Sequence, residues 1–92
     1  MTSPPLESEA QARTLPAVEA AYAAADRDRR RGVLGEQNHR LLCAALSSAG
    51  VELGHYDHRK VMWVASWEPE LAGTIARWIG EAARGREDDG HG

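Results

Sequence analysis

The sequence has no phenylalanine, one cysteine and one lysine among its 92 residues. A single cysteine cannot form an internal disulfide, so Cys43 favours a reducing compartment. No apolar run approaches the roughly 20 residues that a membrane-spanning helix needs. The first residues lack the basic and apolar regions of a signal peptide. We therefore expect a cytoplasmic protein without membrane association.

The patterns that mark common enzyme classes are also missing. The segment 50–54 has glycine at both ends, but no strand precedes it and no lysine follows it, as a phosphate-binding loop requires. Nucleophilic catalysis through Cys43 would need an activating histidine and a group to orient it. His39 is close in sequence, but Cys43 is expected among buried leucines, where a thiol is inert. Glu68 and Glu70 could be taken for a catalytic pair of carboxylates, but their position at the start of a helix is enough to explain them. We predict no enzyme, no cofactor and no small-molecule substrate.

What the sequence does contain is apolar residues at the helical period, with no strand alternation and no internal repeat. Its length allows one domain. The pattern predicts an all-α fold, a small four-helix domain at residues 15–85. A flexible N-terminal segment (1–14) and a flexible acidic tail (86–92) are expected on either side. The expected helices span about 16–31, 36–49, 57–67 and 69–84.

Local signals set the expected helix ends. Pro69 stands at the first position of the last helix, where its missing N–H costs nothing. Asp57 is the expected N-cap of the third helix, and Arg29, Arg30 and Arg31 are expected in the last turn of the first. Glycine is expected just past three helix ends: Gly32, Gly50 and Gly85. Small residues recur on one side of the last helix, where another helix could come close: Gly73, Ala76, Gly80 and Ala83.

The segment Tyr56–Trp67 is the expected centre of the fold, because it is apolar almost all the way round as a helix. Such a helix is normally enclosed by neighbours. Two readings remain open: three other helices close over it, or a domain this small supplies too few neighbours and leaves aromatic side chains for a partner. The leading prediction is a small non-enzymatic protein-interaction or accessory module, able to self-associate as a homodimer through the third and fourth helices. The candidate partner-binding residues are Met62, Trp63, Trp67 and Trp78.

A DNA-binding regulator is the first alternative. Residues 46–60 can be laid over a helix-turn-helix with Gly50 and Val51 as the turn, although Leu46 and Gly54 depart from the usual pattern. The formal charge of −3 argues against a dedicated nucleic-acid binder, and two aspartates are interleaved with the arginines. The arginines that could contact phosphates are Arg27, Arg29, Arg30, Arg31 and Arg40.

A small zinc module is the second alternative. His39 and Cys43 are one helical turn apart, and His55 and His58 begin the next element. Zinc takes tetrahedral nitrogen and sulfur ligands, and two of them one turn apart form a usual half-site. Against this, the spacing matches no known zinc signature and only one thiolate is available. In the competing reading Cys43 is a small residue beside the apolar stripe, and the histidines are solvated or capping.

The run G-V-E-L-G-x-Y-D-x-R-x-x-x-W-x-A-x-W-E-P, from Gly50 to Pro69, resembles a run in small uncharacterised actinobacterial helical proteins. The similarity extends from Gly32 to about Ala83. The resemblance implies one compact helical domain in a high-GC bacterial cytoplasm. It implies no activity and carries over no catalytic residue.

Overall fold

The computed structural model describes residues 5–89, with side chains described for residues 5–85, and this part of the chain contains helices and no strand. Four of its helices are long, in agreement with the four-helix prediction, and a further one is a single turn. None of these helices combines the length and apolar character that crossing a membrane requires. Residues 1–4 and 90–92, where flexible ends were expected, lie outside the described residues. The helices are α1 (Glu9–Ala12), α2 (Pro16–Arg27), α3 (Val33–Ser48), α4 (His55–Ala65) and α5 (Pro69–Asp89).

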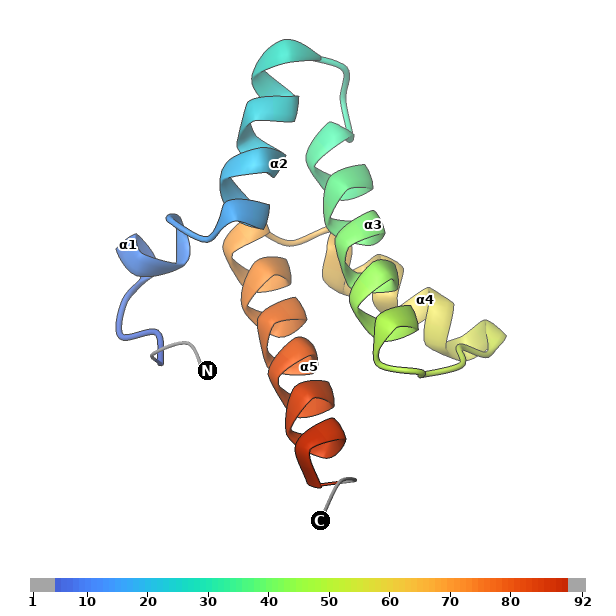
Figure 1. Cartoon of the computed structure of the whole chain (residues 1–92). Helices are drawn as coiled ribbons and strands as arrows, with labels where there is room; N and C mark the ends of the chain where they lie inside the picture. Colours follow the sequence, from blue (N-terminus) through green and yellow to red (C-terminus); the bar gives the residue numbers. More distant parts are fainter. Residues whose placement is uncertain (1–4, 90–92) are drawn as a thin grey trace.

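Helix α3 is the centre of the fold, because α2, α4 and α5 all pack against it (Figure 1). The molecule measures 48 × 33 × 19 Å. A helix with its side chains is about 10 Å across, so the structure is only two helices thick. Few side chains can be enclosed in such a thin molecule.

The buried core is correspondingly small. One cluster joins Leu42 of α3, Ala65 of α4 and Ala72 of α5, and three half-buried residues pack against it: Val61, Val64 and Ile75. On the other side of α5, Gly73 meets the fully buried Val18 of α2 so closely that a Cβ at Gly73 would lie 2.5 Å from Val18 Cγ2. The predicted close approach of another helix to the small-residue side of α5 is confirmed at this position.

Two helix ends follow the local signals in the sequence. Helix α5 begins at Pro69, as predicted. Helix α3 ends at Ser48, and Gly50 just beyond its C-cap is left-handed (φ 79°), with the Gly50 N–H donating to Ser47 O and the Val51 N–H donating to Leu46 O. This pair of hydrogen bonds is the Schellman motif, which satisfies carbonyls that the helix end leaves free.

The connection between α2 and α3 differs from the prediction. Helix α2 ends at Arg27, one turn early, and α3 begins at Val33 instead of 36. The cause is Asp28, which is extended and accepts hydrogen bonds from the backbone N–H and Nε of Arg30. Such local side-chain bonds compete with the helical ladder. Gly32 is left-handed as expected (φ 91°), but it precedes α3 and does not terminate α2.

Two further boundaries were predicted incorrectly, and one short helix was not predicted. Helix α4 begins at His55, and Asp57 lies inside its first turn, where its Oδ2 accepts the Gly54 N–H at 2.9 Å. Helix α5 continues through Gly85 to Asp89, because an exposed glycine in right-handed conformation costs a helix only about 1 kcal/mol. Helix α1 was not predicted: Ser8 caps it by accepting the Gln11 N–H at 3.2 Å.

Of the two readings of the segment 56–67, enclosure by three neighbours is wrong. The segment is helical up to Ala65, but α4 packs mainly on α3 and only touches α5. Trp63 and Trp67 are 62% and 52% exposed. Within residues 5–89, α3 and α5 are the helices that pack on α4, so the residues that make α4 apolar all round are covered on one side alone.

Candidate functional site

The exposed side of α4 and the turn that follows this helix carry three aromatic residues that we call the aromatic face: Tyr56, Trp63 and Trp67. Successive residues turn by about 100° around a helix, so Tyr56 and Trp63 lie roughly 160–180° from the buried Ala65. Trp67 comes directly after the C-cap residue Ser66. Tyr56 is 65% exposed. The two indoles pack edge to face with centroids 5.6 Å apart. The large side chains of α4 therefore point away from the molecule while its small ones pack.

Positive charge accompanies the aromatic face. Lys60 Nζ lies 5.2 Å from the centroid of the Tyr56 ring, within the range of a cation–π interaction. Arg59 is also exposed and precedes Trp63 by one turn. The face therefore presents aromatic surface with two cations at its N-terminal end.

Asn38 fixes the end of α4 from inside the fold. Its side chain is 1% exposed, and its Nδ2 donates to Ala65 O at 3.0 Å and to Trp67 O at 2.8 Å. Carbonyls at a helix C-terminus lack hydrogen-bond partners within the helix. Asn38 therefore supplies a donor to two carbonyls at the end of α4 that would otherwise have none in the fold. Sequence reasoning missed this residue. The available signal was an asparagine one turn before Leu42, on the apolar side of a helix.

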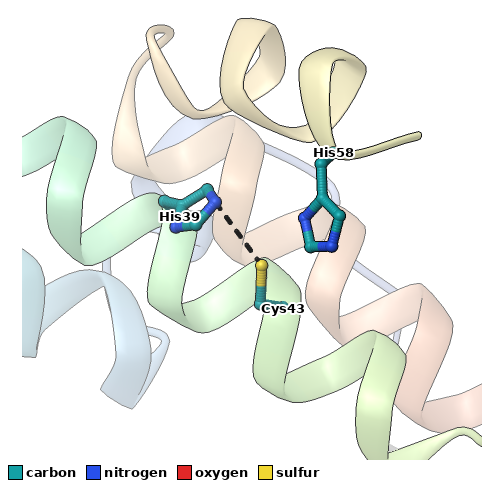
Figure 2. A group of neighbouring side chains, drawn as sticks. All are labelled: His39, Cys43 and His58. Atoms are coloured by element: carbon teal, nitrogen blue, oxygen red, sulfur yellow. Dashed lines mark hydrogen bonds between the residues drawn. The ribbon is translucent and has the colours of Figure 1, made fainter. Parts of the chain in front are cut away.

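Figure 2 shows three side chains that α3 and α4 bring together: His39, Cys43 and His58, called here the His–Cys cluster. Cys43 Sγ lies 3.6 Å from His39 Nε2. One ligand atom of each residue lies within 4.8 Å of the others. His39 and Cys43 are half-buried and His58 is exposed. Three of the four metal candidates from the sequence thus meet, whereas His55, at the first residue of α4, is not part of the group.

A hollow of about 330 Å³ adjoins the cluster. Six residues of α3 and of α4 with its C-cap line it: Gly35, Glu36, His39, Met62, Ala65 and Ser66. Met62 is exposed and follows His58 by one turn. The His39 imidazole of α3 and the Met62 thioether of α4 therefore line the same hollow.

The arginines considered for phosphate contact are distributed over two places. Arg30 is paired with Asp28 (Nε to Oδ2, 2.8 Å) and Glu36 (Nη2 to Oε2, 3.5 Å). The hydrogen bonds from Arg30 lower the pKa of Asp28. Arg40 is exposed on α3. The remaining three are exposed at the end of α2 and in the connection that follows: Arg27, Arg29 and Arg31.

Sequence reasoning also missed a carboxylate network beneath α1. Glu70 is 5% exposed, accepts a hydrogen bond from the Tyr22 hydroxyl and pairs with Arg13 Nε at 3.4 Å. Burial opposes ionisation of Glu70, but hydrogen bonds from Tyr22, its own backbone and Arg13 outweigh it, so its pKa is lowered. The bond to Glu70, followed by burial, raises the pKa of Tyr22 to about 12. The network ties α2 and the α1–α2 turn to α5, which is a structural role.

Trp78, the remaining partner candidate, is 58% exposed on α5. Among the described side chains, the ring pairing joins Trp63 to Trp67 and does not include Trp78. The structure therefore brings Trp63 and Trp67 together. Met62 lines the hollow between α3 and α4, and Trp78 lies on α5.

Comparison of the chain with protein-family models, with curated proteins and with solved structures finds no match. The resemblance of residues 50–69 to actinobacterial proteins stays a prediction.

Proposed function

We propose that the protein is a self-associating interaction module that uses the aromatic face of α4. The supporting observation is that Tyr56 and Trp63 lie opposite the side on which α4 packs, with the exposed Trp67 packed against Trp63. Tryptophan is highly buried on average in folded proteins, and tryptophan and tyrosine are the residues most enriched at interface hot spots. A second copy of the chain is the partner we propose, because an antiparallel arrangement keeps the cations of the two copies apart.

Antiparallel pairing of two α4 helices about a two-fold axis at Trp63 is the proposed arrangement. Arg59 of one copy then lies near the C-terminal end of the other copy's α4, which Trp67 follows, so Arg59 can approach an indole in an attractive cation–π contact. The two copies of Arg59 are eight residues apart along the paired axes, about 12 Å at 1.5 Å per residue. This separation exceeds the screening length of about 8 Å at physiological ionic strength, so repulsion between them is small.

The exposed area indicates a weak dimer. An aromatic side chain offers about 150–250 Å², so the exposed fractions of the three rings amount to roughly 350 Å² per copy. Together with Arg59 and Lys60 on both copies, the interface approaches the lower end of the specific range, about 1,200 Å². We expect a dissociation constant in the micromolar range.

Sedimentation velocity over a wide concentration range tests the proposal, with Trp63→Ala as the disrupting variant. Loss of a central hot spot of about 2 kcal/mol or more should weaken dimerisation by at least about 30-fold. Trp78→Ala is the matched control, since it removes an equally exposed indole from α5 and should leave dimerisation unchanged. A wild-type protein that stays monomeric at every concentration, or equal weakening by both variants, would contradict the proposal.

Nucleic-acid contact is a second candidate, supported by one observation. Arg59 and Lys60 are exposed on the second helix of the α3–α4 pair, the position from which a helix-turn-helix contacts DNA. The pairing of Arg30 with Asp28 and Glu36 weakens the case for the α2–α3 connection. Fluorescence anisotropy with a random duplex should show binding that falls steeply as salt rises; an unchanged anisotropy at low salt would eliminate this candidate.

A further inference from the structure

The His–Cys cluster is a second feature of the molecule that self-association leaves unexplained. We propose that His39, Cys43 and His58 bind one d¹⁰ transition-metal ion, Zn²⁺ or Cu⁺, between α3 and α4. Imidazole nitrogen and thiolate sulfur are the donors that these borderline and soft ions prefer. Helix α3 supplies two donors one turn apart, and α4 supplies the third from the facing side (Figure 2).

The distances suit a shared ion. Tetrahedral zinc with bonds of about 2.0 Å to nitrogen and 2.3 Å to sulfur places those two atoms roughly 3.6 Å apart. Cys43 Sγ and His39 Nε2 are separated by 3.6 Å, and the three ligand atoms lie within 4.8 Å of one another. His58 is exposed, so its imidazole has room to turn toward the other two ligands. On binding, Cys43 loses its thiol proton to solvent and the thiolate donates an electron pair to the metal, so one proton is released per ion.

The fourth coordination position determines which ion fits better. The hollow beside His39 has room for a water molecule, as in a zinc site with three protein ligands. Met62 lines the same hollow one turn beyond His58. A thioether is a good ligand for Cu⁺ and a poor one for Zn²⁺, so Met62 separates the two ions experimentally.

A bound ion would join two helices that otherwise meet over a narrow apolar contact. Because the unfolded chain does not hold the three donors together, binding adds to folding stability. With free metal at about 100 times its dissociation constant, we expect the melting temperature to rise by on the order of 10 °C.

Isothermal titration of the full, chelator-treated chain with Zn²⁺ is the primary test, and Co²⁺ spectroscopy is the second. The wild type should bind one ion per chain, release a proton and show a thiolate-to-cobalt charge-transfer band. Cys43→Ser should abolish the band, and His58→Gln should weaken Zn²⁺ binding by about 100-fold. His55→Gln is the matched control on the same helix and should bind as the wild type does. Circular dichroism of the metal-free variants verifies that each is folded.

Three results would overturn the proposal. They are the absence of one-to-one binding of either Zn²⁺ or Cu⁺ by the wild type, an unchanged charge-transfer band in Cys43→Ser, and an equal loss of Zn²⁺ affinity in His55→Gln and His58→Gln. Competition with a Cu⁺ chelator then distinguishes the ions in Met62→Leu. Weaker Cu⁺ binding with unchanged Zn²⁺ binding assigns the site to Cu⁺, and unchanged affinity for both assigns it to Zn²⁺ with water as the fourth ligand.

Discussion

Replacing Gly73 by alanine should destabilise the protein although alanine is the better helix former. An added Cβ would lie 2.5 Å from Val18 Cγ2, roughly 1 Å inside ordinary van der Waals contact. Val18 is fully buried and its branched side chain has few alternative rotamers. Helices α2 and α5 would therefore have to move apart.

The magnitude follows from two opposing effects. Overpacking of a buried contact costs about 1–3 kcal/mol, and a clash this close with a rigid side chain belongs at the upper end. Alanine recovers about 1 kcal/mol of helix propensity relative to glycine. The expected net loss is about 2 kcal/mol, which lowers the melting temperature by on the order of 10 °C in a domain of this size.

Urea denaturation followed by circular dichroism measures the effect, with Gly80→Ala as the control on the same helix. A Cβ at Gly80 would meet only Arg84 Nη1, at an ordinary 3.5 Å, so this substitution should stabilise by about 0.5–1 kcal/mol. In a double-mutant cycle, Val18→Ala should relieve most of the loss caused by Gly73→Ala. If both glycine substitutions stabilise equally, the close packing of α2 on α5 is refuted.

Three other predictions concern the polar network, the end of α4 and a helix terminator. The pKa of Tyr22 is raised from 10.0 to about 12, so the stability that its hydrogen bond to Glu70 contributes is complete below pH 10 and is lost as the pH rises to 12. Tyr22→Phe should remove this fall of the urea midpoint with pH between 10 and 12. A variant whose urea midpoint still falls over this range would contradict the assignment. Asn38→Leu should cost about 1–3 kcal/mol because two buried carbonyls lose their donor, and an unchanged urea midpoint would contradict that role. Gly50→Ala should lower the thermal midpoint by several degrees because φ there is 79°, whereas Gly54→Ala, at φ −84°, should not.

The parts of the fold that could be predicted depend on signals within a few residues. Pro69 and Gly50 act through their own backbone geometry, so the start of α5 and the end of α3 were predicted correctly. Helix α2 ends early because the Asp28 side chain bonds to Arg30 and competes with the helical hydrogen bonds. The sequence alone does not show whether an aspartate among arginines will form such local bonds or stay within the helix. Gly85 was read as a terminator, but helix propensity tolerates it.

The candidate sites show the same division. His39 and Cys43 are one turn apart, so their pairing was predictable, whereas the arrival of His58 and not His55 depends on how α4 crosses α3. The exposure of Trp63 could not be predicted from α4 alone, because the composition of a helix does not determine how many neighbours cover it. Glu70 and Tyr22 are 48 residues apart and meet only in the folded chain.

Acrylamide quenching of tryptophan emission in the Trp78→Phe variant tests the role of α4 most directly, because only Trp63 and Trp67 then report. Strong quenching is expected in dilute solution, where the monomer exposes both indoles, and the quenching constant should fall as concentration rises and α4 pairs with a second copy. Weak quenching in dilute solution would contradict the exposed aromatic face, and a quenching constant independent of concentration would contradict self-association through it.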